Sequence, residues 1–137
     1  MYLQIIILVL LSCCINTECV RMGIRDNFKK GSVEMVILTL LNESDMYGYQ
    51  LAQEIAKRSD NIIVIPEGSM YPTLYRLVDN GYISDYRELV GKRLTRVYYH
   101  IESAGKERLV ALKEEYALVN KGIQSIFDAE TGGNQNE

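Results

Sequence analysis

The sequence of 137 residues predicts a mainly α-helical fold with one small β-hairpin and a long helix near the C-terminus. Apolar residues recur at helical spacing in three short segments after residue 31, and two β-branched segments flank a basic turn that contains glycine. A further helical pattern runs from residue 103 to about residue 127. Apolar residues make up 47% of the chain and charged residues 24%, which is usual for a globular protein.

The first predicted helix begins at Gly31-Ser32, because the Ser32 hydroxyl can cap its free N–H groups. Its apolar face consists of Val33, Val36, Ile37, Leu40 and Leu41. A polar break follows at residues 42–45, and a second helix is predicted over residues 46–59. Ser44 or Asp45 is expected to cap this second helix.

The third predicted helix begins at Gly68-Ser69, with Ser69 as its N-cap. Pro72 falls in the first turn, where the missing N–H costs little. The predicted buried stripe consists of Leu74, Leu77 and Val78. The helix is expected to end at Asn80-Gly81, since glycine tolerates the left-handed terminal conformation.

Residues 83–89 and 94–101 read as two strands joined by a turn at residues 90–93. Ser103 is expected to cap the last helix, and residues 128–137, rich in Gly, Asn and Gln, are expected to be disordered. Three helices, a hairpin and a helix, in this order, are typical of a winged helix-turn-helix domain. We place that domain at residues 22–102 and a C-terminal dimerisation helix at residues 103–127.

The third helix and the hairpin carry the predicted contacts to duplex DNA. Hydroxyls can bond phosphate or base, arginine can bind guanine through two hydrogen bonds, and each cation that neutralises a phosphate strengthens binding at low salt. The predicted contacts are Ser69, Tyr71, Thr73, Arg76, Lys92, Arg93 and Arg96. The alternatives are that Tyr71 and Tyr75 pack under the hairpin and that the basic tip is an ordinary solvated turn. The net charge of −3 argues mildly against DNA, but residues 90–100 carry three cations and no acid.

The last helix carries apolar residues in steps of three and four, a spacing that suits packing against another helix. These predicted dimer residues are Leu109, Leu112, Tyr116, Val119, Ile123 and Ile126. A second copy of the chain is the simplest partner, and packing on the first helix of the same chain is the alternative. A two-fold dimer would also place two recognition helices about 34–36 Å apart, one turn of duplex DNA.

Residues with catalytic or metal-binding spacing are not found in the sequence, so no enzyme activity, metal or cofactor is predicted. The single histidine, His100, falls in a predicted strand and is interpreted as structural. All three cysteines lie in the first twenty residues. A body without thiols suits a reducing compartment and a cytoplasmic protein.

Residues 5–15 form an apolar run that is too short to span a bilayer as a helix. It resembles the centre of a secretory signal, but no basic residue precedes Arg21. Three interpretations stay open for residues 1–21: a membrane anchor, a buried extension, or translated sequence upstream of a true start at Met22. We favour the last.

Several segments together resemble the PadR family of bacterial transcriptional regulators, over residues 28 to about 112. The segments are Lys30-Gly31-Ser32-Val33-Glu34, Tyr47-Gly48-Tyr49-Gln50-Leu51, residues 66–77, Asn80-Gly81-Tyr82-Ile83, Tyr98-Tyr99-His100-Ile101 and Ala104-Gly105. The resemblance implies a dimeric repressor whose third helix and wing meet DNA, and a small aromatic effector that releases the DNA in some members. Some members stack this ligand on an interface tryptophan, which this chain lacks.

A winged-helix module that binds another protein is the rival interpretation, with residues 5–15 as its tether at a membrane. The net acidic charge favours it slightly. Salt dependence separates the two, because the affinity of a DNA-binding protein falls linearly with the logarithm of the salt concentration.

Overall fold

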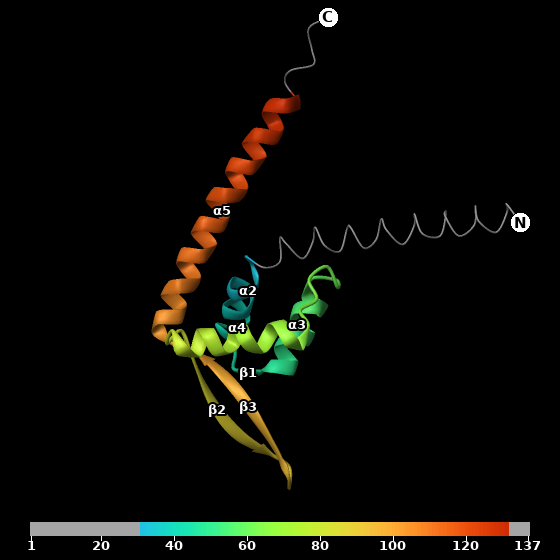
Figure 1. The fold of residues 1–137 in the computed structure, drawn as a ribbon, viewed down its shortest axis with the longest axis vertical. Coiled ribbons are helices and arrows are strands. Elements are labelled where there is room, and N and C mark those ends of the chain that lie inside the picture. The colour runs from blue at the N-terminus through green and yellow to red at the C-terminus, as the bar shows by residue number, and fades with distance from the viewer. Residues whose placement is uncertain (1–30, 132–137) are drawn as a thin grey trace, which may run out of the picture. The chain divides into compact units, whose positions relative to one another are not determined.

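The computed structural model describes residues 31–131, and nearly all of them belong to one compact unit, residues 34–137. The predictions for residues 1–21 and for the three cysteines lie outside the described residues. The elements, in chain order, are α2 (Val33–Leu41), β1 (Met46–Tyr47), α3 (Gly48–Arg58), α4 (Glu67–Asp79), β2 (Ile83–Val90), β3 (Leu94–Ile101) and α5 (Ser103–Thr131) (Figure 1). This order confirms the predicted fold class, mainly α with a small β-hairpin.

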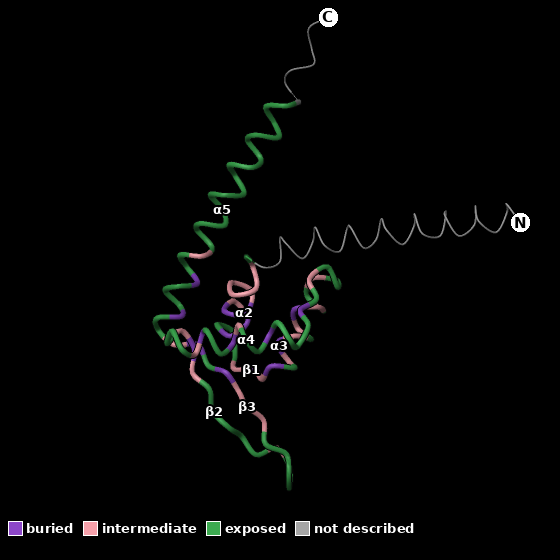
Figure 2. Tube along the Cα trace, in the orientation of Figure 1, coloured by how far each residue is buried: buried purple, intermediate pink, exposed green. Residues whose placement is uncertain are grey.

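The hydrophobic core lies where α2, α3 and α4 meet the base of the hairpin (Figure 2). Its largest fully buried side chains are Ile37, Leu38, Leu41, Leu51, Met70, Leu74, Leu77 and Ile83. Burial of such side chains stabilises the fold by about 1.5–3 kcal/mol each. The predicted inward positions of α4 are confirmed for Leu74 and Leu77, whereas Val78 is only half-buried.

The second helix begins later than predicted. Residues 46 and 47 form β1, which pairs antiparallel with β3 through Met46↔Tyr99 and Tyr47↔Tyr98. The extended backbone turns Met46 into the core, at 4% exposure, so burial decides the conformation here. The predicted caps were also wrong, because the N-cap of α3 is Tyr47 and no side chain caps it.

The third helix begins at Glu67, two residues before the predicted N-cap. Pro66 is the N-cap, in an extended conformation, and its carbonyl oxygen accepts the N–H groups of Ser69 and Met70 at 2.9 and 3.0 Å. Ser69 therefore lies inside the first turn and caps nothing. The predicted end is confirmed, since Gly81 has a φ of +73°.

The hairpin is confirmed, with β1-β3-β2 as the strand order of a three-stranded sheet. The last helix extends to Thr131, so the expectation of disorder from residue 128 was wrong for its first residues. The Gln124 amide donates to Asp128 Oδ1 at 3.1 Å, a contact one turn apart that supports the added turn. Ser103 is the first residue of α5 rather than its cap. None of the helices in residues 31–131 has the length and apolar character needed to cross a membrane.

Candidate nucleic-acid interface

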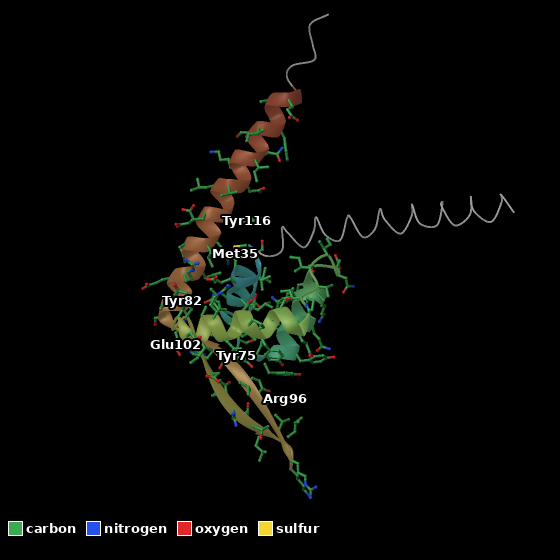
Figure 3. All side chains as sticks on the ribbon, in the orientation of Figure 1. Met35, Tyr75, Tyr82, Arg96, Glu102 and Tyr116 are labelled. Carbon is green, nitrogen blue, oxygen red and sulfur yellow. The ribbon has the colours of Figure 1, made fainter. Side chains whose placement is uncertain are left out.

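A cleft of about 420 Å³ lies between the first turn of α3, one flank of α4 and the inner face of the hairpin. Figure 3 labels Tyr75 on α4 and Arg96 on β3, which both line it. The full lining is Tyr47, Gly48, Tyr49, Tyr71, Tyr75, Asp85, Arg87, Thr95, Arg96, Val97 and Tyr99. Several tyrosines and two arginines thus line one concave surface.

Tyr71 and Tyr75 form the α4 side of the cleft. Their ring centroids lie 6.3 Å apart and the rings are tilted by 31°. The Tyr71 ring lies against the start of α3, where a Cβ on Gly48 would be 3.0 Å from Tyr71 Cε1. Glycine at this position therefore lets the ring approach the helix backbone.

The outer face of the sheet holds the hairpin to β1. Tyr98 stacks on Tyr86 at 5.7 Å and meets Tyr47 edge-on at 5.5 Å. The Arg96 guanidinium lies 4.5 Å above the Tyr47 ring, a cation–π contact that fixes this side chain at the rim of the cleft.

Asp45 joins the same outer face to the loop before β1. Its Oδ2 accepts the Tyr86 hydroxyl at 3.0 Å, and its Oδ1 lies 2.7 Å from His100 Nδ1. The hydrogen bond to Asp45 raises the pKa of Tyr86. These contacts fit the structural role predicted for His100.

The predicted DNA contacts occupy several surfaces. Tyr71 and Arg96 lie in the cleft, together with Tyr75, and the exposed Lys92 and Arg93 lie at the hairpin tip. Helical spacing puts the other three, Ser69, Thr73 and Arg76, on the opposite flank of α4.

On the opposite flank of α4, one side chain contacts another helix and one bonds within α4 itself. Thr73 Oγ1 donates to the Ser69 carbonyl at 3.1 Å, and Arg76 Nη2 lies 3.6 Å from Glu34 Oε2. Glu34 Oε1 also accepts Arg108 Nε at 2.9 Å, which raises the pKa of Arg108. The seven predicted contacts therefore do not form one continuous surface.

Sequence reasoning missed Gly48, Arg87 and Tyr99 as cleft residues. The alternation of side chains between the two faces of a strand could have identified Arg87, because Arg87 lies on the same face of β2 as the buried Ile83. The approach of Tyr71 to Gly48 joins two helices and leaves no local pattern in the sequence.

The predicted dimer residues divide into a buried and an exposed group. Leu109 is 4% exposed and belongs to the core of its own chain, and Leu112 is half-buried. The remaining four are exposed by 42–64%: Tyr116, Val119, Ile123 and Ile126. Figure 2 shows that the outer part of α5 is exposed throughout, and these four side chains place large rings and apolar groups along it.

The helices α2, α3 and α4 with a hairpin beside α4 define a winged helix-turn-helix protein. The chain belongs to the PadR-like family of transcriptional regulators, whose family model matches residues 37–111. It is 30% identical over 109 residues to a transcriptional regulator of Mycobacterium tuberculosis, covering 78% of this chain and 95% of that protein.

Solved structures of other proteins share this fold, and two of them serve as examples. A transcriptional regulator from Clostridium thermocellum matches with a TM-score of 0.68 and 35% identity, over 72% of this chain and 96% of that one. Bacillus subtilis PadR, in complex with operator DNA, matches with a TM-score of 0.54 and 24% identity, over 57% of this chain and 44% of that one. The second likeness is one of fold alone.

Proposed function

We propose that the protein is a cytoplasmic homodimeric repressor that binds a pseudo-palindromic operator. The observation that carries this proposal is the cleft between α4 and the hairpin, lined by the hydroxyl-bearing rings of Tyr71 and Tyr75 and by Arg87 and Arg96. In a winged helix, a recognition helix enters the major groove while the neighbouring contacts position the phosphate backbone. Membership of a family of transcriptional regulators supports the assignment.

The exposed stripe of α5 supports the dimer. Tyr116, Val119 and Ile123 expose 55%, 59% and 42% of their surface in the single chain. Their steps of three and four are those of a helix seam, and a second α5 would bury the same residues in return. Such a dimer would present two α4 helices to one face of the duplex.

An apolar groove of about 380 Å³ between α2, the end of α3 and α5 is the candidate site for a small aromatic effector. Met35 and Tyr116, labelled in Figure 3, line it together with Ile55 and Ile63. A ligand in this groove would touch both the body of the domain and the helix proposed to form the dimer. Aromatic compounds that bind there are expected to lower the affinity for the operator.

The test is a footprint and a salt titration of the purified full chain on the promoter beside its own gene. The expected result is protection of a two-fold symmetric sequence, with an observed binding constant that falls linearly in log–log form as salt rises. A chain that ignores duplex DNA at low ionic strength would overturn the proposal and favour a protein-binding module instead.

A further inference from the structure

Glu34 contacts arginines from two other helices. It lies in the first turn of α2, where its Oε1 accepts a hydrogen bond from Arg108 Nε of α5 at 2.9 Å. Its Oε2 lies 3.6 Å from Arg76 Nη2 of α4. The Glu34 side chain is 17% exposed, so this carboxylate is largely shielded from water. One carboxylate thus joins the base of α5 to α4.

The two contacts of Glu34 differ in strength. The Arg108 contact is a direct hydrogen bond between charged groups, and such bonds are roughly twice as strong as neutral ones. The same guanidinium lies over the ring of Tyr82, labelled in Figure 3, at 5.7 Å from the ring centroid, and this contact holds it further. The Arg76 contact is too long for a hydrogen bond and leaves only an attraction between charges. Arg108 is therefore the main partner of Glu34.

Another carboxylate of the chain shows how an arginine binds when the carboxylate is not shared. Among the described residues, Glu43 forms its ion pair with Arg58 alone, and both of its oxygens accept Arg58 Nη1, at 2.9 and 2.8 Å. Glu34 does not bind Arg76 in this way, since its Oε1 is occupied by Arg108. The bond from Arg108 therefore accounts for the long, weak contact of Arg76.

The Glu34 carboxylate would compete with DNA for Arg76. A contact that the free chain makes and the complex lacks subtracts from the binding free energy. The Arg76 side chain is 60% exposed on α4 and is predicted to contact DNA. Without Arg108, Glu34 would bind this guanidinium closely with both oxygens and would hold it away from the duplex.

We propose that Arg108 is a positioning residue for DNA binding, because it occupies Glu34 and so keeps the Arg76 guanidinium available to the duplex. This inference deepens the proposed function and rests on it. Arg108 acts through Glu34 and makes no contact with DNA itself. The base of α5 thereby controls a side chain of α4, so a rearrangement of α5 that weakens the Arg108 bond lowers the affinity for DNA.

The experiment measures operator binding by the full chain and by Arg108→Gln, Glu34→Gln and the variant that carries both changes. We expect Arg108→Gln to weaken binding by about three- to fivefold, the range of one surface ion pair, because Glu34 then holds Arg76. Glu34→Gln should bind at least as tightly as the parent, since no carboxylate competes for Arg76. In the Glu34→Gln background, Arg108→Gln should change the affinity by less than about twofold, because its route to Arg76 is gone.

Two further variants separate position from charge. Lys106→Gln is the matched control, since Lys106 is exposed in the first turn of α5 and its loss removes the same charge from the same end of the helix. It should bind as the parent does. Arg108→Lys keeps the charge and a donor beside Glu34, and it should restore most of the affinity. Circular dichroism checks that each variant is folded, and Glu34→Gln tests the inference even if Arg108→Gln does not fold.

Three results would overturn this inference while leaving DNA binding established. The first is a loss from Arg108→Gln that persists in the Glu34→Gln background, which would make Arg108 a direct contact. The second is weaker binding by Glu34→Gln alone, and the third is an equal loss from Lys106→Gln. A parent chain that binds no duplex at low ionic strength would overturn the proposed function and this inference together.

Discussion

Gly105 of α5 lies directly against the carbonyl oxygen of Tyr82, so that a Cβ at Gly105 would overlap with it. The same Tyr82 oxygen accepts the Glu102 N–H at 2.9 Å, and the Arg108 guanidinium lies 5.7 Å from the Tyr82 ring. Glu102, just before α5, and Gly105 and Arg108 within it thus contact the short connection between α4 and β2. The direction in which α5 leaves the domain is therefore coupled to the end of α4.

Gly105→Ala should lower the free energy of unfolding by about 1–3 kcal/mol, because the added methyl group meets backbone rather than a side chain that can move. Urea denaturation of the two chains measures this. The matched control is Gly122→Ala on the same helix, where a Cβ meets nothing within 4 Å. That variant should gain up to about 1 kcal/mol from helix propensity. If Gly105→Ala were as stable as Gly122→Ala, the close approach to Tyr82 would be wrong.

Arg76→Ala should weaken binding to the operator by about 1–3 kcal/mol if Arg76 reads a base. Its side chain is 60% exposed, and its contact to Glu34 is long at 3.6 Å. An exposed pair of this kind contributes little to stability, so the guanidinium is free to turn toward DNA and the variant should fold normally. Competition between operator and unrelated duplex is the measurement. An equal loss on both would make Arg76 a phosphate contact, and no loss would remove it from the interface.

The hairpin tip should contribute charge and no sequence preference. Replacing Lys92 and Arg93 by alanine is expected to weaken binding to every duplex and to lower the salt slope by about 2, since each cation accounts for about 0.9 of it. Both residues are exposed in the turn, so stability should not change. Fluorescence anisotropy at several salt concentrations gives the slope. A slope equal to that of the parent chain would mean that the tip stays away from the phosphates.

Local patterns predicted most of the fold. Ile37, Leu41, Leu74 and Leu77 lie at helical spacing and are buried as expected, because the apolar face of each helix is the face that packs in the core. Gly81 follows the end of α4 and Gly91 lies in the hairpin turn. Both have a φ of +73°, a conformation that favours glycine, so the glycines in the sequence were enough to predict the helix end and the turn. The start of α3 could not be predicted in this way. Met46 becomes extended only because β3, some fifty residues later, supplies the strand that pairs with it.

The candidate site was predicted less completely than the fold. Tyr71 and Arg96 were expected at a DNA surface and do line the cleft. Tyr99 was not among the predicted contacts, and only the packing around it shows a buried ring whose hydroxyl has no hydrogen bond to a described residue. Arg76 was expected to contact DNA from its position on α4, and the structure shows its guanidinium 3.6 Å from Glu34, a residue of another helix. Contacts between distant segments decide such roles.

Substitutions in the outer part of α5 and at its base should have different effects, because only the outer part is proposed to form the dimer. Ile123→Glu should dissociate the proposed dimer, because a charge would be buried in the seam, while leaving the fold of the single chain intact. Leu109→Glu should instead unfold the chain, since Leu109 is 4% exposed within it. Sedimentation equilibrium with circular dichroism distinguishes the two outcomes. A dimer that survives Ile123→Glu would place the main interface elsewhere than along α5.

The free energy of unfolding should fall at alkaline pH, because ionisation of the buried Tyr99 hydroxyl is unfavourable in the folded chain. Its pKa is raised to about 12 in the folded chain by burial, against an ordinary value near 10. The unfolded chain therefore loses this proton first, so the stability that Tyr99 contributes is complete below about pH 10 and is lost as pH rises toward 12. A shift of this size corresponds to roughly 2–3 kcal/mol. Tyr99→Phe should show a shallower fall in the free energy of unfolding over this interval than the parent chain. Denaturant titrations at steps from about pH 10, the ordinary pKa of tyrosine, to about pH 12, the raised pKa of Tyr99, measure the slopes. Identical slopes for Tyr99→Phe and the parent would show that this hydroxyl ionises as readily in the folded chain as in the unfolded one.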